Sequence, residues 1–287
     1  MAGSATAGDP RPAGAPRVRL VALDLDGTLL TRGNAISDAN AAAVRDAVAA
    51  GVHVVFATSR WYRLAKATAG LLGVTAPIIC HNGAMIRDPR DDSVILRHDI
   101  APDAAREVAR LADDARYESI VTVRDETWMT TKRADIDPAR LPAGMRLSRT
   151  LSEHVGDGAE AFLFFGQDAV DGLRAALGDR YDGVLNLAWG FSETFPPYLN
   201  IVNAAADKGR ALRLVCDRLG VPLDETMAIG DAAPDLDMMR VAGLSVAMGN
   251  APADVQAQAT VTGPGNREDG VAWAIRRFAL PAPPPSG

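Results

Sequence analysis

Two aspartates separated by one residue follow an apolar run near the start of the sequence, where residues 21–28 read VALDLDGT. Side chains alternate along an extended strand, so Asp24 and Asp26 are expected to point the same way. Like charges this close repel each other, and a hard divalent cation such as Mg²⁺, which prefers oxygen ligands, would relieve the repulsion. The alternative is that the pair only caps a turn, which short acidic side chains do well.

Three further polar positions stand where chemistry could occur. Thr58 and Ser59 follow a second apolar run, so their hydroxyl and N–H groups could bind phosphate oxygens, or else cap the next helix. Lys208 begins a predicted helix, where the helix dipole disfavours a cation. It would therefore neutralise Asp24 or a phosphate oxygen, unless it is an ordinary solvated lysine.

A second acidic pair, Asp231 and Asp235, follows a predicted strand with the spacing Gly-Asp-x-x-x-Asp. This spacing could place one carboxylate on a metal ion and the other directly behind it.

Strand-like and helix-like segments alternate at both ends of the chain, which is typical of parallel βαβ units. The predicted strands are 19–25, 52–58, 77–80, 226–229 and 244–247, and the predicted helices are 38–50, 62–72, 208–219, 235–242, 252–258 and 269–278. We therefore expect an α/β fold with a Rossmann-like, doubly wound parallel-sheet core.

The middle of the chain has a different pattern, with predicted strands 119–123, 161–165 and 183–188 and predicted helices 101–114 and 168–177. This mixture predicts an inserted α+β cap domain. The expected organisation is a core of 17–83 and 198–280, a cap of 84–197, and disordered tails at 1–16 and 281–287.

Composition limits the function. The net charge of −6 argues against a nucleic-acid binder, and no run is apolar and long enough for a signal peptide or a membrane span. Cys80 and Cys216 stand in apolar segments and are expected to be core thiols. We expect a cytoplasmic monomer or homodimer with neither nucleic-acid nor membrane partners.

Taken together and in order, these segments resemble the haloacid dehalogenase superfamily, specifically its Cof-type phosphatases (subclass IIB, with a C2-type cap). The resemblance rests on residues 24–30 (DLDGTLL), Thr58 with Arg60, 81–84 (HNGA), 207–209 (DKG), 230–235 (GDAAPD), 246–251 (VAMGNA) and 268–271 (EDGV).

This resemblance implies a Mg²⁺-dependent phosphoric monoester hydrolase. Asp24 would be the nucleophile that forms an aspartyl-phosphate. Asp26 would protonate the leaving alcohol and then activate water, and its backbone carbonyl would also contact the metal. Asp231 would bind the metal directly, with Asp235 bound to it or just behind.

The remaining roles concern phosphate. By the same resemblance, Thr58 and Ser59 would bind the transferring phosphoryl group and Lys208 would neutralise its charge. Asn82 resembles an asparagine that lines this site, although a structural role is the alternative.

The chain departs from the family pattern at two positions. Ser59 stands where the family usually has glycine, and Pro234 stands where asparagine is common, so an amide hydrogen bond near the site would be missing. A rival function therefore stays open, that of a non-catalytic protein that binds a phosphorylated metabolite. A phosphomutase is the second rival, because it uses the same aspartyl-phosphate intermediate.

The implied substrate is a small phosphorylated metabolite, with sugar phosphates first and phosphorylated cofactors second. In such proteins the cap reads the leaving group, so specificity is expected between residues 84 and 197. The candidates are polar or aromatic residues near predicted strand ends, namely Arg124, Trp128, Lys132, Trp189 and Glu193. Packing is the alternative for the two tryptophans.

Overall fold

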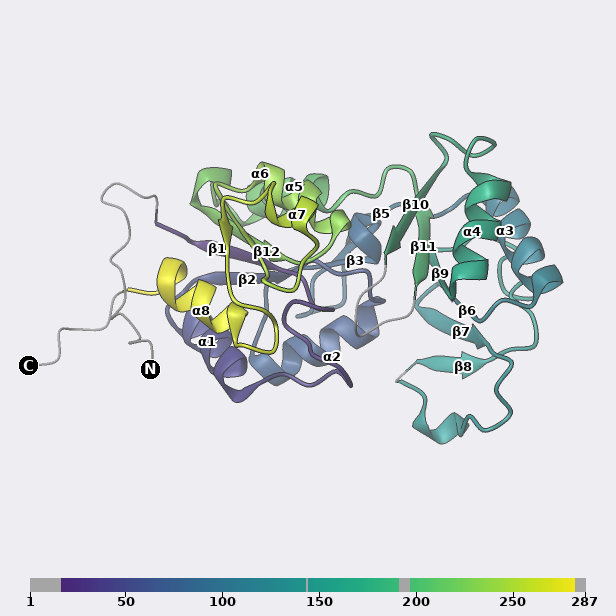
Figure 1. Ribbon diagram of the computed structural model, residues 1–287, viewed down its shortest axis with the longest axis horizontal. Helices are drawn as coiled ribbons and strands as arrows, with labels where there is room; N and C mark the ends of the chain where they lie inside the picture. The colour runs from purple at the N-terminus through teal and green to yellow at the C-terminus, as the bar shows by residue number, and fades with distance from the viewer. Residues whose placement is uncertain (1–16, 143, 191–196, 282–287) are drawn as a thin grey trace, which may run out of the picture. The chain divides into compact units, whose positions relative to one another are not determined.

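The computed structural model describes residues 17–142, 144–190 and 197–281 (Figure 1). The predicted disordered tails lie outside these residues, apart from Pro281, and so does the cap candidate Glu193. The chain forms two compact units. Their described parts are 17–55, 72–74 and 213–281 in the first unit, and 56–71, 75–142, 144–190 and 197–212 in the second.

A five-stranded sheet organises the first unit, in the order β14-β13-β12-β1-β2. Its strands are β1 (Leu20–Leu23), β2 (His53–Phe56), β12 (Thr226–Gly230), β13 (Leu244–Ala247) and β14 (Val261–Thr262). β12 pairs in parallel with both β1 and β13. The strand that starts the chain thus adjoins one from its last quarter, and the strand order reverses between them. Ligands of such sheets bind beyond the carboxyl ends of the strands at this reversal.

Helices cover both faces of this sheet, as a doubly wound fold requires, with α6 and α7 on one side and α1 and α8 on the other (Figure 1). The bounds are α1 (Asp38–Ala49), α2 (Tyr62–Leu72), α5 (Lys208–Leu219), α6 (Leu236–Val241), α7 (Ala253–Gln256) and α8 (Gly270–Ala274). The predicted α1 is confirmed: Ser37 caps it by accepting a hydrogen bond from the N–H of Asn40, and Gly51 follows it with φ +80°.

The late helices are shorter than predicted. A 3₁₀ turn over Ala233–Asp235 precedes α6, because Pro234 sits in the first turn, where its missing N–H costs no helical hydrogen bond. At the other end, α8 continues as a π-helical turn over Ile275–Ala279. None of the described helices combines the length and apolar character that crossing a membrane requires.

A six-stranded sheet organises the second unit, in the order β10-β11-β9-β6-β7-β8. Its strands are β6 (Ser119–Val123), β7 (Glu126–Thr130), β8 (Met145–Leu147), β9 (Ala161–Phe165), β10 (Leu185–Gly190) and β11 (Tyr198–Asn203). Two helices, α3 (Pro102–Ala115) and α4 (Gln167–Leu177), pack with Phe162 and Phe164 of this sheet in one hydrophobic cluster.

The two faces of this sheet differ. Val121 and Leu199 belong to the cluster that α3 and α4 cover, and they pair across the sheet with Trp128 and Trp189 respectively. Both tryptophans therefore lie on the helix-covered face, where Trp128 stacks on His154 and Trp189 carries the guanidinium of Arg174. This placement favours the packing alternative for Trp128, whereas Trp189 is 43% exposed.

A small antiparallel sheet of β3 (Ile78–Cys80), β4 (Met85–Arg87) and β5 (Val94–Arg97) completes the second unit. A single parallel bridge joins Ile79 to Ala57, the residue after β2. The predicted limits of core and cap stay a prediction, although β11, placed in the core by the sequence, pairs with β9 and β10 of the six-stranded sheet.

Candidate active site

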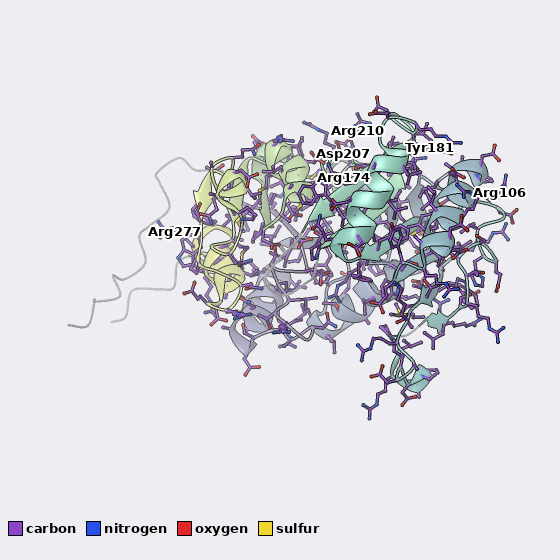
Figure 2. All side chains as sticks on the ribbon, turned by 45° about the vertical axis from the view of Figure 1, so that its right-hand side comes forward. Arg106, Arg174, Tyr181, Asp207, Arg210 and Arg277 are labelled. Atoms are coloured by element: carbon purple, nitrogen blue, oxygen red, sulfur yellow. The ribbon has the colours of Figure 1, made fainter. Side chains whose placement is uncertain are left out.

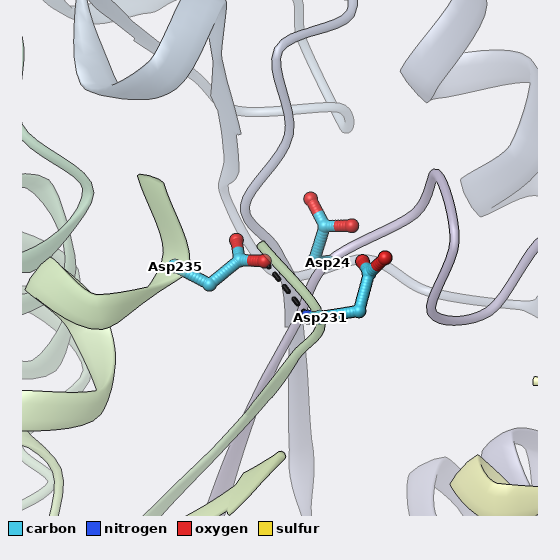
Figure 3. Close-up of side chains that lie close together, drawn as sticks. All are labelled: Asp24, Asp231 and Asp235. Carbon is cyan, nitrogen blue, oxygen red and sulfur yellow. Dashed lines mark hydrogen bonds between the residues drawn. The ribbon is translucent and has the colours of Figure 1, made fainter. Parts of the chain in front are cut away.

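Three of the predicted site residues, Asp24, Asp231 and Asp235, form one group in the first unit (Figure 3). Asp24 follows β1 and Asp231 follows β12, and Leu23 pairs with Ile229, so both aspartates emerge at the same sheet edge. Their side chains are 5% and 6% exposed, and that of Asp235 is 1% exposed. Each carboxylate has an oxygen within 4.8 Å of one on each of the others.

Asp235 organises the loop that carries Asp231. Its Oδ2 accepts hydrogen bonds from the backbone N–H groups of Asp231 and Ala232, both at 3.0 Å, and Figure 3 marks the first. Gly230 makes room for it, because a β-carbon at Gly230 would stand 2.5 Å from the β-carbon of Asp235. Asp235 thus fixes the loop that carries Asp231, and its predicted place, bound to a metal or just behind it, stays a prediction.

Two neutral donors that the sequence reasoning did not assign hold Asp231. Thr28 donates from Oγ1 to Oδ1 of Asp231 at 2.8 Å. The amide of Asn250 lies 3.4 Å from Oδ2 of Asp231 and donates to the carbonyl of Gly27 at 2.9 Å. Asn250 follows β13, the neighbour of β12, so the edge rule that found Asp24 and Asp231 could also have found it.

This group suits a hard divalent cation. Three buried carboxylates this close repel each other, and a cation within about 4–6 Å favours their ionised forms. The donors that hold Asp231 and fix its loop include hydroxyl, amide and backbone N–H groups. Mg²⁺ takes oxygen ligands, often one or two carboxylates together with phosphate and water. The residues therefore fit the predicted metal.

Asp26 is placed differently from Asp24. β1 ends at Leu23, so strand alternation does not govern the two aspartates. The chain instead folds back, with the N–H of Leu30 donating to the carbonyl of Leu25 at 2.7 Å. Within the described residues, the side chain of Asp26 is not part of the cluster formed by Asp24, Asp231 and Asp235, and Asp26 is partly exposed. A partly exposed carboxyl beside a buried one suits a group that exchanges protons with water.

In the second unit, Thr58 is fully buried. Its N–H donates to the carbonyl of Ile79 at 2.9 Å, and its Oγ1 accepts from the N–H of Arg60 at 3.1 Å. α2 begins only at Tyr62, so this hydrogen bond to the Thr58 hydroxyl closes a short turn before the helix. Ser59 next to it is partly exposed.

Asn82 lies in a turn that follows β3. Three consecutive residues there have left-handed backbone, with φ +50° at His81, +53° at Asn82 and +98° at Gly83. The N–H of Asn82 donates to the carbonyl of Thr58 at 3.0 Å, and its Nδ2 donates to Oδ1 of Asn200 at 2.8 Å. The predicted structural role of Asn82 thus has direct support, while its predicted contact with phosphate stays a prediction.

Lys208 begins α5 and is only 3% exposed, so the solvated-lysine alternative is wrong. Asp207 caps the helix, its Oδ1 accepting from the N–H of Arg210 at 2.8 Å (Figure 2). A buried ammonium group at the positive end of a helix is costly unless negative charge compensates it. Both features suit a residue that binds anionic oxygen.

Comparison with known proteins adds a family match. A family model described as haloacid dehalogenase-like hydrolase matches residues 21–275. A Bacillus subtilis phosphatase of 5-amino-6-(5-phospho-D-ribitylamino)uracil, YitU, is 28% identical, covering 90% of this chain and 97% of its own. A phosphoglycolate phosphatase of Archaeoglobus fulgidus is 27% identical, covering 91% and 97%.

Solved structures share the fold. The structure of TM0651 from Thermotoga maritima superimposes with a TM-score of 0.74 at 28% identity, covering 92% of this chain and 98% of its own. A sugar phosphatase described as subclass IIB, BT4131, also gives a TM-score of 0.74, covering 91% and 99%. At 20% identity, the second likeness concerns the fold.

Proposed function

This chain belongs to the haloacid dehalogenase-like hydrolases, and on that premise we propose that it hydrolyses a small phosphorylated metabolite through an aspartyl-phosphate on Asp24. The family predicted from the motifs is thereby confirmed, as is the α/β fold with a parallel core sheet. The observation that carries the proposal is the group of three buried carboxylates at the edge of that sheet, where the strand order reverses.

Two steps divide the reaction. A carboxylate oxygen of Asp24 attacks the phosphorus atom, the bond to the ester oxygen breaks, and Asp26 gives a proton to the departing alcohol. Asp26 then takes a proton from water, the water oxygen attacks the same phosphorus, and the acyl phosphate bond breaks, which restores Asp24 and releases phosphate. The burial of Asp24 and the partial exposure of Asp26 fit this division of work.

Charge compensation makes the first step feasible, since a carboxylate otherwise repels a phosphate ester. Asp24 and Asp231, with the backbone carbonyl of Asp26, would hold Mg²⁺, and Asp235 would fix the loop behind them. Bound there, the ion would supply positive charge opposite the phosphoryl oxygens. Thr58 and Lys208 would bind the remaining oxygens, and Ser59 and Asn82 would add donors.

The substrate proposed is a small metabolite, with sugar phosphates first. Two of the relatives that share more than a quarter of the aligned residues are phosphatases, one of a ribityl-bearing uracil phosphate and one of phosphoglycolate, both small molecules. The six-stranded sheet is the part of the chain proposed to read the leaving group. We propose a cytoplasmic enzyme, monomeric or homodimeric, with no nucleic-acid partner.

Phosphate release from a panel of sugar phosphates, nucleotides and phosphorylated cofactors tests the proposal, with and without Mg²⁺. Wild type is compared with Asp24→Asn and with Asp46→Asn, which changes an exposed aspartate of α1. We expect metal-dependent turnover that only Asp24→Asn abolishes. An isomeric phosphate ester in place of free phosphate would indicate a phosphomutase. Phosphate binding without turnover on any compound would indicate a binding protein.

A further inference from the structure

Turn 81–83, the left-handed turn formed by His81, Asn82 and Gly83, supports both residues proposed to bind phosphate in the second unit. The N–H of Asn82 holds the carbonyl of Thr58, and Gly83 lies against the backbone that leads into Lys208. A β-carbon at Gly83 would stand 2.4 Å from the carbonyl oxygen of Asp207, the cap of α5. A shift of this turn would therefore move Thr58 and the start of α5 together.

This turn is conformationally costly. Non-glycine residues in the left-handed region are strained, histidine more than asparagine, so two in a row persist only where the surroundings hold them. The side chain of Asn82 is held by Asn200, whose own Nδ2 donates to the carbonyl of Phe162 at 3.0 Å. The hydrogen bond to Asn200 holds Asn82 in its left-handed conformation, and a different contact must hold His81.

Glu160 is the acidic group that faces His81. Nε2 of His81 is buried and has no hydrogen-bond partner within the described residues; it lies 3.6 Å from Oε2 of Glu160, just beyond hydrogen-bond length. Both side chains are almost fully buried, at 3% and 2% exposure.

Glu160 is itself fixed. Its Oε1 accepts from the N–H of Asp125 at 3.1 Å and lies 3.3 Å from Nη2 of Arg97. Burial acts to raise the pKa of Glu160, but its interaction with His81 and the charge of Arg97 outweigh burial and lower the pKa below its ordinary value. The carboxylate of Glu160 beside His81 is therefore ionised. The proposed mechanism assigns no role to Glu160.

We infer that Glu160 is a positioning residue, which acts through His81 to hold turn 81–83 and with it Thr58 and Lys208 in the geometry that binds the phosphoryl group. The inference rests on the proposed function, since it concerns the same phosphate-binding residues. Glu160 precedes β9, so the six-stranded sheet would contribute to phosphate binding through this contact.

The test compares Glu160→Gln, His81→Asn and the double variant with wild type. Asparagine tolerates the left-handed backbone that position 81 requires, and glutamine keeps the shape of Glu160 without its charge. Glu107→Gln is the matched control, because Glu107 likewise pairs with basic side chains, those of Arg110 and Arg180, but lies on α3. Three quantities are measured: kcat, KM, and the Kd of inorganic phosphate in the presence of Mg²⁺.

We expect Glu160→Gln to lower kcat about tenfold or more, with KM changed less than about threefold, because misplaced groups lose contacts made in the transition state. His81→Asn should give a similar loss, and the double variant should lose no more than either single variant. Phosphate should bind about threefold or more weakly in each. Glu107→Gln should match wild type, and melting temperatures show which variants are folded.

Several results would overturn the inference. If Glu160→Gln retains wild-type kcat while wild type is active, the inference fails and the proposed function stands. Losses that multiply in the double variant would mean that Glu160 does not act through His81. If Glu160→Gln does not fold, His81→Asn decides, and unchanged kcat there overturns the inference. If wild type turns over no compound, the proposed function fails. The inference is then overturned as well if wild type does not bind phosphate, or if Glu160→Gln binds phosphate as tightly as wild type.

Discussion

Gly27 and Asp231 lie so close that a β-carbon on Gly27 would stand 2.2 Å from Oδ2 of Asp231. Gly27 also has φ +85°, a backbone conformation that residues other than glycine and asparagine rarely adopt. The glycine of the first motif is therefore needed for two reasons, the turn itself and the space that the carboxylate fills.

Gly27→Ala should accordingly displace Asp231 and lower turnover by about a hundredfold or more, since small misplacements at a reacting centre cost about that much. Gly33→Ala is the control, because Gly33 has φ +81° but no atom within 4 Å of the added carbon. It should cost about 1–2 kcal/mol of stability and retain full turnover. Steady-state kinetics and thermal melting of both variants decide the matter, and equal turnover would contradict this reading of the site.

Mg²⁺ should stabilise the folded protein, because the carboxylates proposed to hold it are brought together only in the native state. At a concentration of one hundred times Kd the gain is about 2.7 kcal/mol. Asp231→Asn should remove most of this gain, whereas Asp46→Asn should keep it. Thermal melts with EDTA and with increasing Mg²⁺ measure the effect.

Thr28→Val should weaken the metal site without removing it. The change deletes the hydroxyl that donates to Asp231 while nearly conserving volume, and a lost hydrogen bond to a charged group costs about 1.5–3 kcal/mol. We expect kcat/KM to fall about tenfold and the Mg²⁺ midpoint to rise. Thr31→Val is the control, since Thr31 donates only to the exposed carbonyl of Ala35. An unchanged Mg²⁺ midpoint would mean that Thr28 does not support Asp231.

The lowered pKa of Glu160 predicts how stability depends on pH. A carboxyl whose pKa is depressed by folding contributes stability that is fully present above its unfolded pKa, about 4.3, and is lost as pH falls through the folded value. The difference in unfolding free energy between wild type and Glu160→Gln should thus be largest near neutral pH and should shrink below about pH 4. Urea unfolding at several pH values measures it, and a difference independent of pH would refute the assignment.

Both thiols should be inert in the native protein. Burial raises the pKa of Cys80, which is fully buried, and that of Cys216, so little thiolate is present at either. An aromatic disulfide reagent at pH 8 should label neither thiol in buffer and both in urea. Rapid native labelling of either one would contradict its predicted place in the core.

Much of the cluster of three carboxylates was predictable, because the carboxyl ends of parallel strands meet at one edge of the sheet. Asp24 and Asp231 needed only the recognition of two buried strands, and Lys208 was marked by its unfavourable place at a helix start. The same edge rule would have found Asn250. Local patterns suffice where the fold repeats one simple unit.

The support behind the site was not predictable in this way. Asn82 meets Asn200 across 118 positions, and Glu160 stands in a polar stretch that gives no sign of burial. The sequence did not indicate β7, because two of its buried positions hold polar residues, Thr127 and Thr130. Its buried and exposed positions therefore do not alternate between apolar and polar residues. Long-range pairing decides such positions, and one sequence contains no record of it.

The pairing of β1 with β12 places a delay between the synthesis of Asp24 and the synthesis of Asp231. Thr28 and Asp231 stand 203 positions apart, and a ribosome that adds about 5–20 residues per second needs about 10–40 s to cover that distance. Throughout that time the nascent chain carries Asp24 without the loop that supplies Asp231 and Asp235. Every shortened product of interrupted synthesis that stops before β12 is therefore expected to be inactive toward phosphate esters inside the cell.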